Sequence, residues 1–397
     1  MKSLLNSIKS DPEHKNIRDS ITIFASLGAL GLCQVLKGLL VAVFPSFLPL
    51  FFTAQFFGST IQGFISDIIK RSLVFNISLC VVILITSTLA YTNHLHGSSI
   101  NLIQMTSIVL FAIGGNADIV GRAEIIDIRY KSDRRKVMSW TVFSEAFSWV
   151  LIGLLMRYFQ LNPFNILVGT IFLAVALLII SLIFNNDKTR DPDHWQRVKN
   201  ALKPALKKHF NRTFFAYLIV LTGELAYFFF FYSQVNPLDK NAVLLADSYL
   251  SSFIGMSLGC VFVGSFKKTG DFSNLMIGFL VSFLSIVLFI SGGMETLIDP
   301  GVFKFDSFIF LLNGFGSGIF LPCFYSMISR GHSVHVQGFL TGTIDSLRVL
   351  GDSLTSTVLV VTVAAQSPFP IYISCMLFSS SIILLVFYKK NNDFKKS

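Results

Sequence analysis

The sequence predicts an all-α integral membrane protein with twelve transmembrane helices arranged as two six-helix halves. Two observations lead to this fold class. The chain of 397 residues is 53% hydrophobic and only 14% charged, with a mean hydropathy of +0.66, whereas soluble domains carry about 25% charged residues. Its apolar residues also come in runs of about 20, which is the length that crosses a hydrocarbon core of about 30 Å. These runs should be helical because unpaired backbone groups cannot lie in lipid.

Twelve runs of this kind follow one another along the chain. We expect spans at about 21–44, 47–67, 72–91, 101–122, 138–158, 163–184, 213–233, 247–266, 274–293, 307–328, 338–361 and 368–388. The longest loop, after the sixth span, divides them into two equal sets. The predicted parts are a cytoplasmic N-terminal segment (1–20), a first half (21–184), a linker (185–212), a second half (213–388) and a cytoplasmic tail (389–397).

The distribution of basic residues predicts the orientation. Most of the 32 lysines and arginines fall in the two terminal segments and in the loops that follow the even-numbered spans. Basic loops stay in the cytoplasm, so both termini should be cytoplasmic. The first twenty residues lack the apolar core and cleavage site of a signal peptide. This topology also accounts for the net charge of +10, and no nucleic-acid partner is expected.

The linker 185–212 is strongly basic and contains Trp195 among spaced apolar residues. This pattern predicts an amphipathic helix that lies on the cytoplasmic membrane surface. Anionic lipid and the tryptophan would hold it there.

Charged residues inside the spans indicate function, because a charge in a membrane interior is costly and usually faces a partner or a water-filled path. Spans three, six, nine and twelve contain none. Five other spans contain Lys37, Asp118, Glu145, Glu224, Asp345, Arg348 and Asp352. This distribution favours a solute transporter. No nucleophile–base set, cofactor motif or metal-ligand cluster is visible, so an enzyme, a cofactor and a metal site are not expected.

Two basic residues are candidates for substrate binding. Lys37 lies about seven residues, or roughly 10 Å of helix, from the outer end of its span. It either faces a cavity or extends toward the outer surface. Arg348 shares one helix face with Asp345 and Asp352, where it either completes a structural ion network or binds a carboxylate or phosphate of the substrate.

Three carboxylates are candidates for proton coupling, namely Glu224, Glu145 and Asp345. An apolar environment favours the protonated form of a carboxylate, which suits a group that is loaded and unloaded by a proton gradient. The alternative for each is permanent pairing with a cation on another helix, and Glu145 has Arg122 as a possible partner. Glu224 and Asp345 are also substrate-binding candidates.

Span ten contains the glycine-rich stretch Asn313–Gly318. A phosphate-binding loop would need a preceding strand and a lysine, and the stretch has neither. Close helix packing explains the glycines better. Asn313 remains a polar candidate for substrate binding, and weaker cavity candidates are Gln55, Gln62, Asn116 and Asp118.

The loop after span two has a glycine, an acid and basic residues at Gly63, Asp67, Lys70 and Arg71. A weaker copy, with Gly264 and Asp271, follows span eight. With twelve spans, a 6 + 6 division and a basic central loop, the chain resembles the major facilitator superfamily over its whole length. The resemblance implies alternating access, a monomer, and spans three, six, nine and twelve against lipid. It also implies a cytoplasmic gate made by the loop after span two, to which we add Arg122 and Asp127 at the end of span four.

Residues Ala123–Asp127 and Arg134–Ser139 are similar to bacterial drug-efflux members of that family, although the Gly-Pro pair typical of antiporters in span five is missing. We therefore expect proton-coupled uptake of a small anionic or zwitterionic solute across a bacterial inner membrane. An amino acid, a carboxylate metabolite and a carboxylate siderophore are candidate substrates. Proton-driven export of a drug or siderophore is the first alternative, and a non-transporting receptor or scaffold is the second.

Overall fold

The structure is a computed structural model. It describes residues 12–43, 47–92, 95, 97–129, 134–158, 163–184, 194–207, 210–232, 247–265, 270–292, 305–330, 332–363 and 369–393. These residues form helices and a few turns, and no strand occurs among them. The all-helical prediction is therefore confirmed for the described part of the chain.

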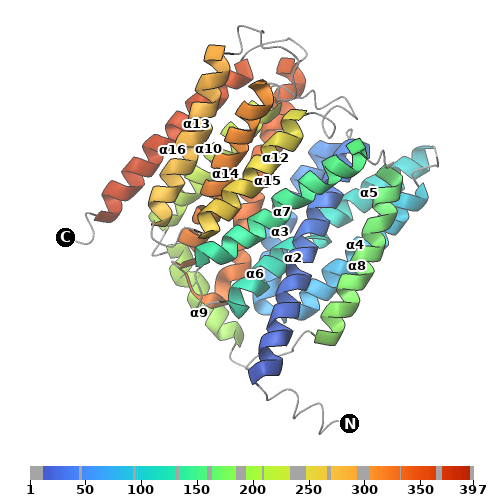
Figure 1. The fold of residues 1–397 in the computed structure, drawn as a ribbon. Helices are drawn as coiled ribbons and strands as arrows, with labels where there is room; N and C mark the ends of the chain where they lie inside the picture. Colours follow the sequence, from blue (N-terminus) through green and yellow to red (C-terminus); the bar gives the residue numbers. More distant parts are fainter. Residues whose placement is uncertain are drawn as a thin grey trace.

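Helices occupy every predicted span. The first half contains α2 (Pro12–Val43), α3 (Leu48–Ile68), α4 (Arg71–Thr92), α5 (Ser98–Gly114), α6 (Ala117–Ile128), α7 (Arg134–Tyr158) and α8 (Pro163–Phe184). The second half contains α10 (Phe210–Tyr232), α12 (Asp247–Ser265), α13 (Asp271–Gly292), α14 (Phe305–Arg330), α15 (Gln337–Val363) and α16 (Phe369–Asp393). In Figure 1 the helices of the first half gather on one side and those of the second half on the other.

Two further helices lie outside these sets. The linker forms α9 (His194–Lys207), in agreement with the predicted amphipathic helix, and a short 3-10 helix, η2 (Val334–Val336), precedes α15. Helix α9 packs against η2, α3 and α10. The linker helix therefore contacts both halves of the protein.

Eight segments of the described chain are long and apolar enough to cross a membrane. They are Ile17–Leu40, Arg71–Thr92, Ser99–Ile128, Arg134–Leu155, Phe164–Phe184, Asp271–Ser291, Ser307–Arg330 and Ile371–Lys389. Helices α10 and α12 carry shorter apolar segments. The chain is thus a multi-pass membrane protein by composition and helix length.

The fourth span extends beyond its predicted bounds of 101–122. It continues to Ile128 and is interrupted at residues 115–116, so that α5 and α6 are two helices in one segment. The physical reason is the glycine pair Gly114 and Gly115, which opens the helical hydrogen-bond ladder. Gln62 of α3 closes the gap, because its amide donates to the Gly114 oxygen (3.0 Å) and its carbonyl accepts from the Asn116 N–H (3.1 Å). Backbone groups exposed by a break inside a membrane need such partners.

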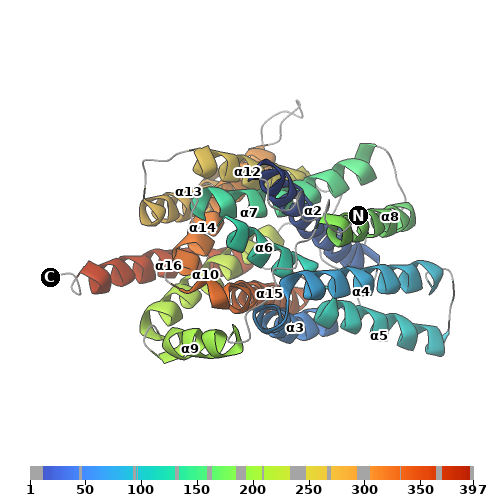
Figure 2. The same ribbon diagram turned by 90° about the horizontal axis from the view of Figure 1, so that it is seen from below.

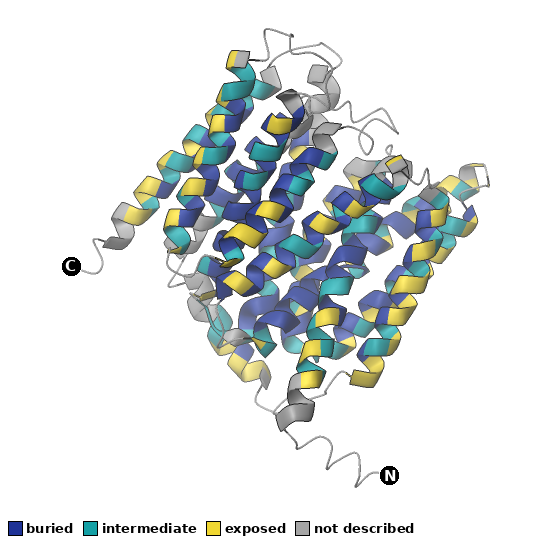
Figure 3. Ribbon diagram, in the orientation of Figure 1, coloured by how far each residue is buried: buried dark blue, intermediate teal, exposed yellow. Residues whose placement is uncertain are grey.

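Four helices lie on the outside of the bundle, in the arrangement that the family resemblance implies. Helices α4, α8, α13 and α16, which correspond to spans three, six, nine and twelve, present large apolar side chains on their outer faces. Figure 3 shows exposed residues along the outside of these helices and buried residues toward the centre of the bundle. Apolar side chains exposed in this way suit contact with lipid tails.

The glycine-rich stretch of α14 packs closely, as its sequence predicts. A Cβ added at Gly314 or Gly318 would overlap backbone oxygens of α12, at Ser252 and Met256 respectively. Asn313 lies on the side of α13, where its amide donates to the Ser285 hydroxyl at 3.1 Å. Small residues let two membrane helices approach each other in this way.

The two halves meet at two main places in the described chain. Helix α3 packs against α15, and α7 packs against α12 and α14. The view from below shows α3 beside α15, and α7 beside α12 and α14 (Figure 2). Side chains from both halves can therefore meet at these contacts.

Candidate functional site

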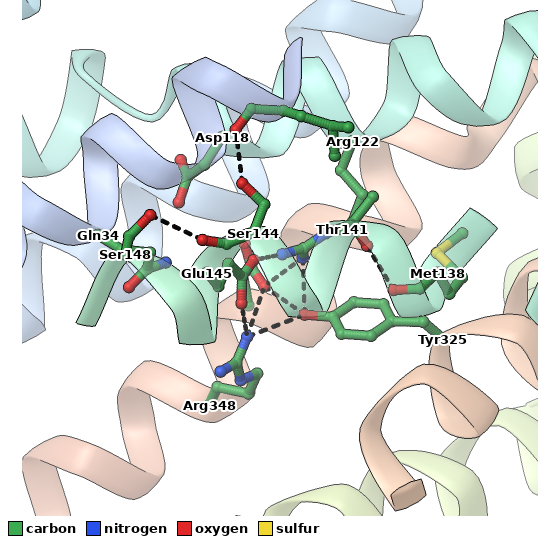
Figure 4. A network of polar contacts seen from close by, with 12 residues as sticks. Gln34, Asp118, Arg122, Met138, Thr141, Ser144, Glu145, Ser148, Tyr325 and Arg348 are labelled. Atoms are coloured by element: carbon green, nitrogen blue, oxygen red, sulfur yellow. Dashed lines mark hydrogen bonds and ion pairs between the residues drawn. The ribbon is translucent and has the colours of Figure 1, made fainter. Parts of the chain in front are cut away.

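A cluster of buried charges lies where the halves meet. We call it the central network, and it consists of Arg122 (α6), Glu145 (α7), Glu224 (α10), Tyr325 (α14), Asp345 and Arg348 (α15). Figure 4 shows Arg122, Glu145, Tyr325 and Arg348 converging from different helices. A charged cluster of this kind inside a membrane protein marks a functional site.

Arg122 is fully buried and joins the two halves. Its guanidinium pairs with Asp345 of the second half at 2.8 Å and with Glu145 of its own half. The same group donates to the Tyr325 hydroxyl (2.7 Å) and lies over the Tyr325 ring, 4.4 Å from its centroid. The planar guanidinium with its five donors suits a buried pairing of this kind.

Arg348 makes the reciprocal connection from the second half. It pairs with Glu145 of the first half (3.1 Å), with Glu224 (3.4 Å) and, more weakly, with Asp345 (3.8 Å). Tyr325 links both arginines, because its hydroxyl accepts from Arg122 (2.7 Å) and from Arg348 (3.3 Å). The same hydroxyl donates to Asp345 (2.6 Å). Each half thus supplies an arginine to a carboxylate of the other half, and moving the halves apart must break these pairs.

A second ion pair lies within the first half. Lys37 of α2 donates to Asp118 of α6 at 2.8 Å. Asp118 occupies the first turn of α6, directly after the break in the fourth span. The acid that pairs with Lys37 thus lies directly after the break, and Lys37 contacts it inside the protein rather than extending to the outer surface.

Charge and exposure follow a clear order in this site. The partly exposed cations are Lys37, with 14% of its side chain exposed, and Arg348, with 19%. The carboxylates Asp118, Glu145, Glu224 and Asp345 are at most 8% exposed. Lys37 and Arg348 are therefore the more exposed charges of the site, whereas Arg122 and the carboxylates are more deeply buried. Taken together, the three cations Lys37, Arg122 and Arg348 face four carboxylates.

An apolar wall adjoins the network one helical turn along α7 from Glu145. Trp149 stacks on Phe253 of α12 with ring centroids 5.4 Å apart, and its indole N–H donates to Gln34 at 3.3 Å. These rings come from different halves, like the partners of the central network. This stacked pair is a second contact between the halves, one helical turn along α7 from Glu145.

The predicted gating loop forms a latch between the halves. Both carboxylate oxygens of Asp67 accept backbone N–H groups at the start of α15, from Gly338 (2.9 Å) and Phe339 (2.7 Å). A carboxylate stabilises a helix N-terminus because the free N–H groups and the helix dipole favour negative charge. Arg71 pairs with Asp67 at 2.7 Å and with Asp127 at 3.1 Å, so three of the predicted gating residues meet in one place.

Gly63 completes this contact between α3 and α15. An added Cβ would overlap the Gly338 oxygen and crowd Gly342. Lys70 follows α3, half-buried, at the same end of the helix. Arg122, which we placed with the gate, instead belongs to the central network, because the fourth span extends beyond residue 122 and carries that position deeper into the bundle.

A second latch, that is, a polar contact between the halves, involves Asp271 in the loop after span eight, which is the weaker copy of the loop after span two. Asp271 pairs with Arg330 (3.2 Å) and Arg135 (3.7 Å) and accepts from the Ser326 hydroxyl (2.9 Å). Arg135 begins α7 of the first half, so this acid also joins the halves. Arg135 and Arg330 were not predicted as site residues, because their shared partner Asp271 lies far from both along the chain.

Some predicted site residues lie elsewhere. Asn313 contacts α13 and is not part of the central network. The side chain of Asp352 lies outside the described residues. Tyr325 was missed, and the only signal for it in the sequence is a tyrosine within a span that lacks charges. Among the described residues, no group of three or more His, Cys, Asp or Glu side chains could hold a metal ion.

Comparison with known proteins identifies the family of the chain. The model of the Major Facilitator Superfamily matches residues 21–356. The fold is similar to a crystal structure of a bacterial homologue of the iron transporter ferroportin in an outward-facing state with soaked iron. The TM-score is 0.67 and the identity 11%, over 94% of this chain and 99% of the other. No curated protein sequence matches the chain. The chain belongs to the Major Facilitator Superfamily, and it is a membrane transporter.

Proposed function

We propose that this protein is a proton-coupled secondary transporter that takes up a small anionic or zwitterionic solute by alternating access. In this proposal twelve spans form two six-helix halves around the central network, with α5 and α6 counted as one span and α9 lying outside the membrane core. The protein acts as a monomer in a bacterial inner membrane, with both termini in the cytoplasm.

The exposure of two cations is the observation that supports an anionic or zwitterionic substrate. Lys37 and Arg348 are the more exposed charges of the site, whereas the side chains of their carboxylate partners are less exposed. A carboxylate of the solute reaches these cations first and replaces a protein carboxylate on Arg348, in the two-bond geometry that a guanidinium favours. An amino group of a zwitterion would then pair with the carboxylate that Arg348 releases.

The extra carboxylate supports proton coupling. Among the described side chains of the site, the four acids Asp118, Glu145, Glu224 and Asp345 outnumber the three cations Lys37, Arg122 and Arg348, so their charges sum to −1 when all seven are ionised. A buried group in this situation favours its protonated form. Glu224 is our choice for the proton carrier, because its partner is the Nε atom of Arg348 (3.4 Å), the same residue that we assign to the substrate. Glu145 and Asp345 each pair with both arginines. We therefore rank them below Glu224 as carriers of the transported proton.

The latches support alternating access. Asp67 and Asp271 both bind across the halves, as closure on one side of the membrane requires. We assign them to the cytoplasmic side, so the state described here is closed to the cytoplasm. Gly63, Lys70, Arg71 and Asp127 belong to this gate in our proposal.

Two other transport functions remain testable. Export of a drug or siderophore follows from the resemblance at Ala123–Asp127. Transport of a metal cation is a further candidate, because the similar structure is described as a homologue of an iron transporter and the site has a surplus carboxylate. At 11% identity that likeness supports the fold alone, and we therefore rank both below solute uptake.

A ligand screen tests the substrate class. Ligands that bind the folded state raise its apparent melting temperature. We expect an amino acid, a carboxylate or a carboxylate siderophore to stabilise the purified protein, and Lys37→Gln and Arg348→Gln to lose this shift. Lys136→Gln removes an exposed charge on α7 and should keep it. Stabilisation by hydrophobic cations or Fe²⁺ alone, unchanged in the first two variants, contradicts the proposed substrate class.

A further inference from the structure

The described side chains of α9 that pack against the rest of the protein lie in the stretch from Val198 to Leu202. Val198 is fully buried, and Ala201 and Leu202 pack against the core. These contacts join α9 to η2, α3 and α10. Val198, Ala201 and Leu202 therefore hold the helix against the protein, whereas its described polar and aromatic side chains between 195 and 200 are exposed.

The outward side combines an aromatic ring with positive charge. Trp195 is 50% exposed, and Arg197 and Lys199 are exposed as well. Trp195 and Lys199 are four positions apart, which places them on one face of a helix. The sequence of α9 contains four basic residues, Arg197, Lys199, Lys203 and Lys207, and no acidic residue. Packing inside the protein does not explain an exposed tryptophan in this setting.

The place of α9 in the fold limits what can cover this side. Figure 2 shows α9 at the edge of the bundle, beside α10 and α15, rather than over its centre. It also contacts η2, the turn before α15, at the end of the bundle where the Asp67 latch lies. A helix at the edge of a membrane bundle, on the side of its basic loops, meets the headgroups of the surrounding lipid.

We propose that the exposed side of α9 docks on anionic phospholipid in the cytoplasmic leaflet. Charge complementarity identifies the partner, because a purely basic helix is attracted to the negative surface potential of that leaflet. Exposed tryptophan is typical of the interface between headgroups and acyl chains. The partner is a lipid surface and not a soluble anion, since a free anion would not account for Trp195. This proposal does not depend on the transported solute.

Trp195 fluorescence tests the proposal directly. The full-length protein and its Trp195→Phe variant are reconstituted in vesicles of phosphatidylcholine, with and without phosphatidylglycerol, and the difference between their emission spectra reports Trp195. We expect phosphatidylglycerol to shift this emission to shorter wavelength and to make it quenchable by brominated lipid. Raising the salt from 0.1 to 1 M should reverse much of the effect, because the screening length falls from about 10 Å to about 3 Å.

Charge variants separate docking from a general change in the protein. Lys199→Gln combined with Lys203→Gln should lose most of the phosphatidylglycerol-dependent quenching. Lys136→Gln, an exposed charge on α7, should retain it. Equal emission with and without phosphatidylglycerol, together with quenching by aqueous iodide in both vesicles, overturns the proposal. Inorganic phosphate that reproduces the emission shift in phosphatidylcholine also overturns it, because the partner is then a soluble anion.

Discussion

Replacing Arg122 with glutamine should abolish transport and lower the free energy of unfolding by about 3–5 kcal/mol, the usual cost of removing one partner from a buried ion pair. Arg122 is fully buried between Asp345 of the second half and Glu145 of the first. Glutamine leaves both carboxylates facing a single arginine, Arg348. The loss of stability is measured by denaturation in detergent, and the loss of transport by solute uptake in proteoliposomes.

Arg122→Lys is the matched control, because it keeps the charge but loses the planar guanidinium that reaches Asp345 and Tyr325 together. We expect it to recover part of the stability and little of the transport. Arg122→Gln with unchanged uptake would show that the bond between the halves plays no part in the transport cycle. Unchanged stability would show that Asp345 and Glu145 do not depend on Arg122.

A methyl group at position 63 should shift the transporter away from the state described here. Gly63→Ala places a Cβ against the Gly338 oxygen and Gly342 where α3 meets α15. Overpacking of this kind costs about 1–3 kcal/mol, and each 1.4 kcal/mol changes a population ratio about tenfold. Transport should fall accordingly. Spin labels on cysteines at Ile69 and Ser265, exposed positions at the ends of α3 and α12, should report a larger separation.

Gly169→Ala provides the control for this experiment. Gly169 lies in α8, where an added Cβ would meet no atom within 4 Å. The control should leave uptake and the label distance unchanged, and both proteins need a background without the five native cysteines. If Gly63→Ala keeps the label distances of the parent protein, the contact between α3 and α15 does not hold the closed state.

The fold follows largely from local properties of the sequence. Runs of about 20 apolar residues place a helix at each predicted span, and the charge-free spans correspond to α4, α8, α13 and α16. The break in the fourth span was missed, although Gly114 and Gly115 stand at that point. Glycines in membrane helices serve close packing as well as breaks, so the pair alone did not distinguish the two.

The candidate site was predicted as a set of residues rather than as a geometry. The pairing of Glu145 with Arg122, one of two readings of Glu145 in the sequence, is confirmed. The bond from Arg122 to Asp345 spans 223 positions, and no local pattern identifies partners at that separation. The same limit applies to the latch, where Asp67 binds the backbone at Gly338 and Phe339 and not a charged residue.

Proton-driven uptake in proteoliposomes tests the central claim most directly. The carboxylate or zwitterion that gives the largest thermal shift is supplied outside, with the pH outside lower than inside, and with vesicles of equal internal and external pH as the comparison. We predict that the gradient drives accumulation above the external concentration, and that Glu224→Gln binds the solute but no longer accumulates it. Equal uptake with and without the gradient, or full accumulation by Glu224→Gln, would contradict proton coupling through this site.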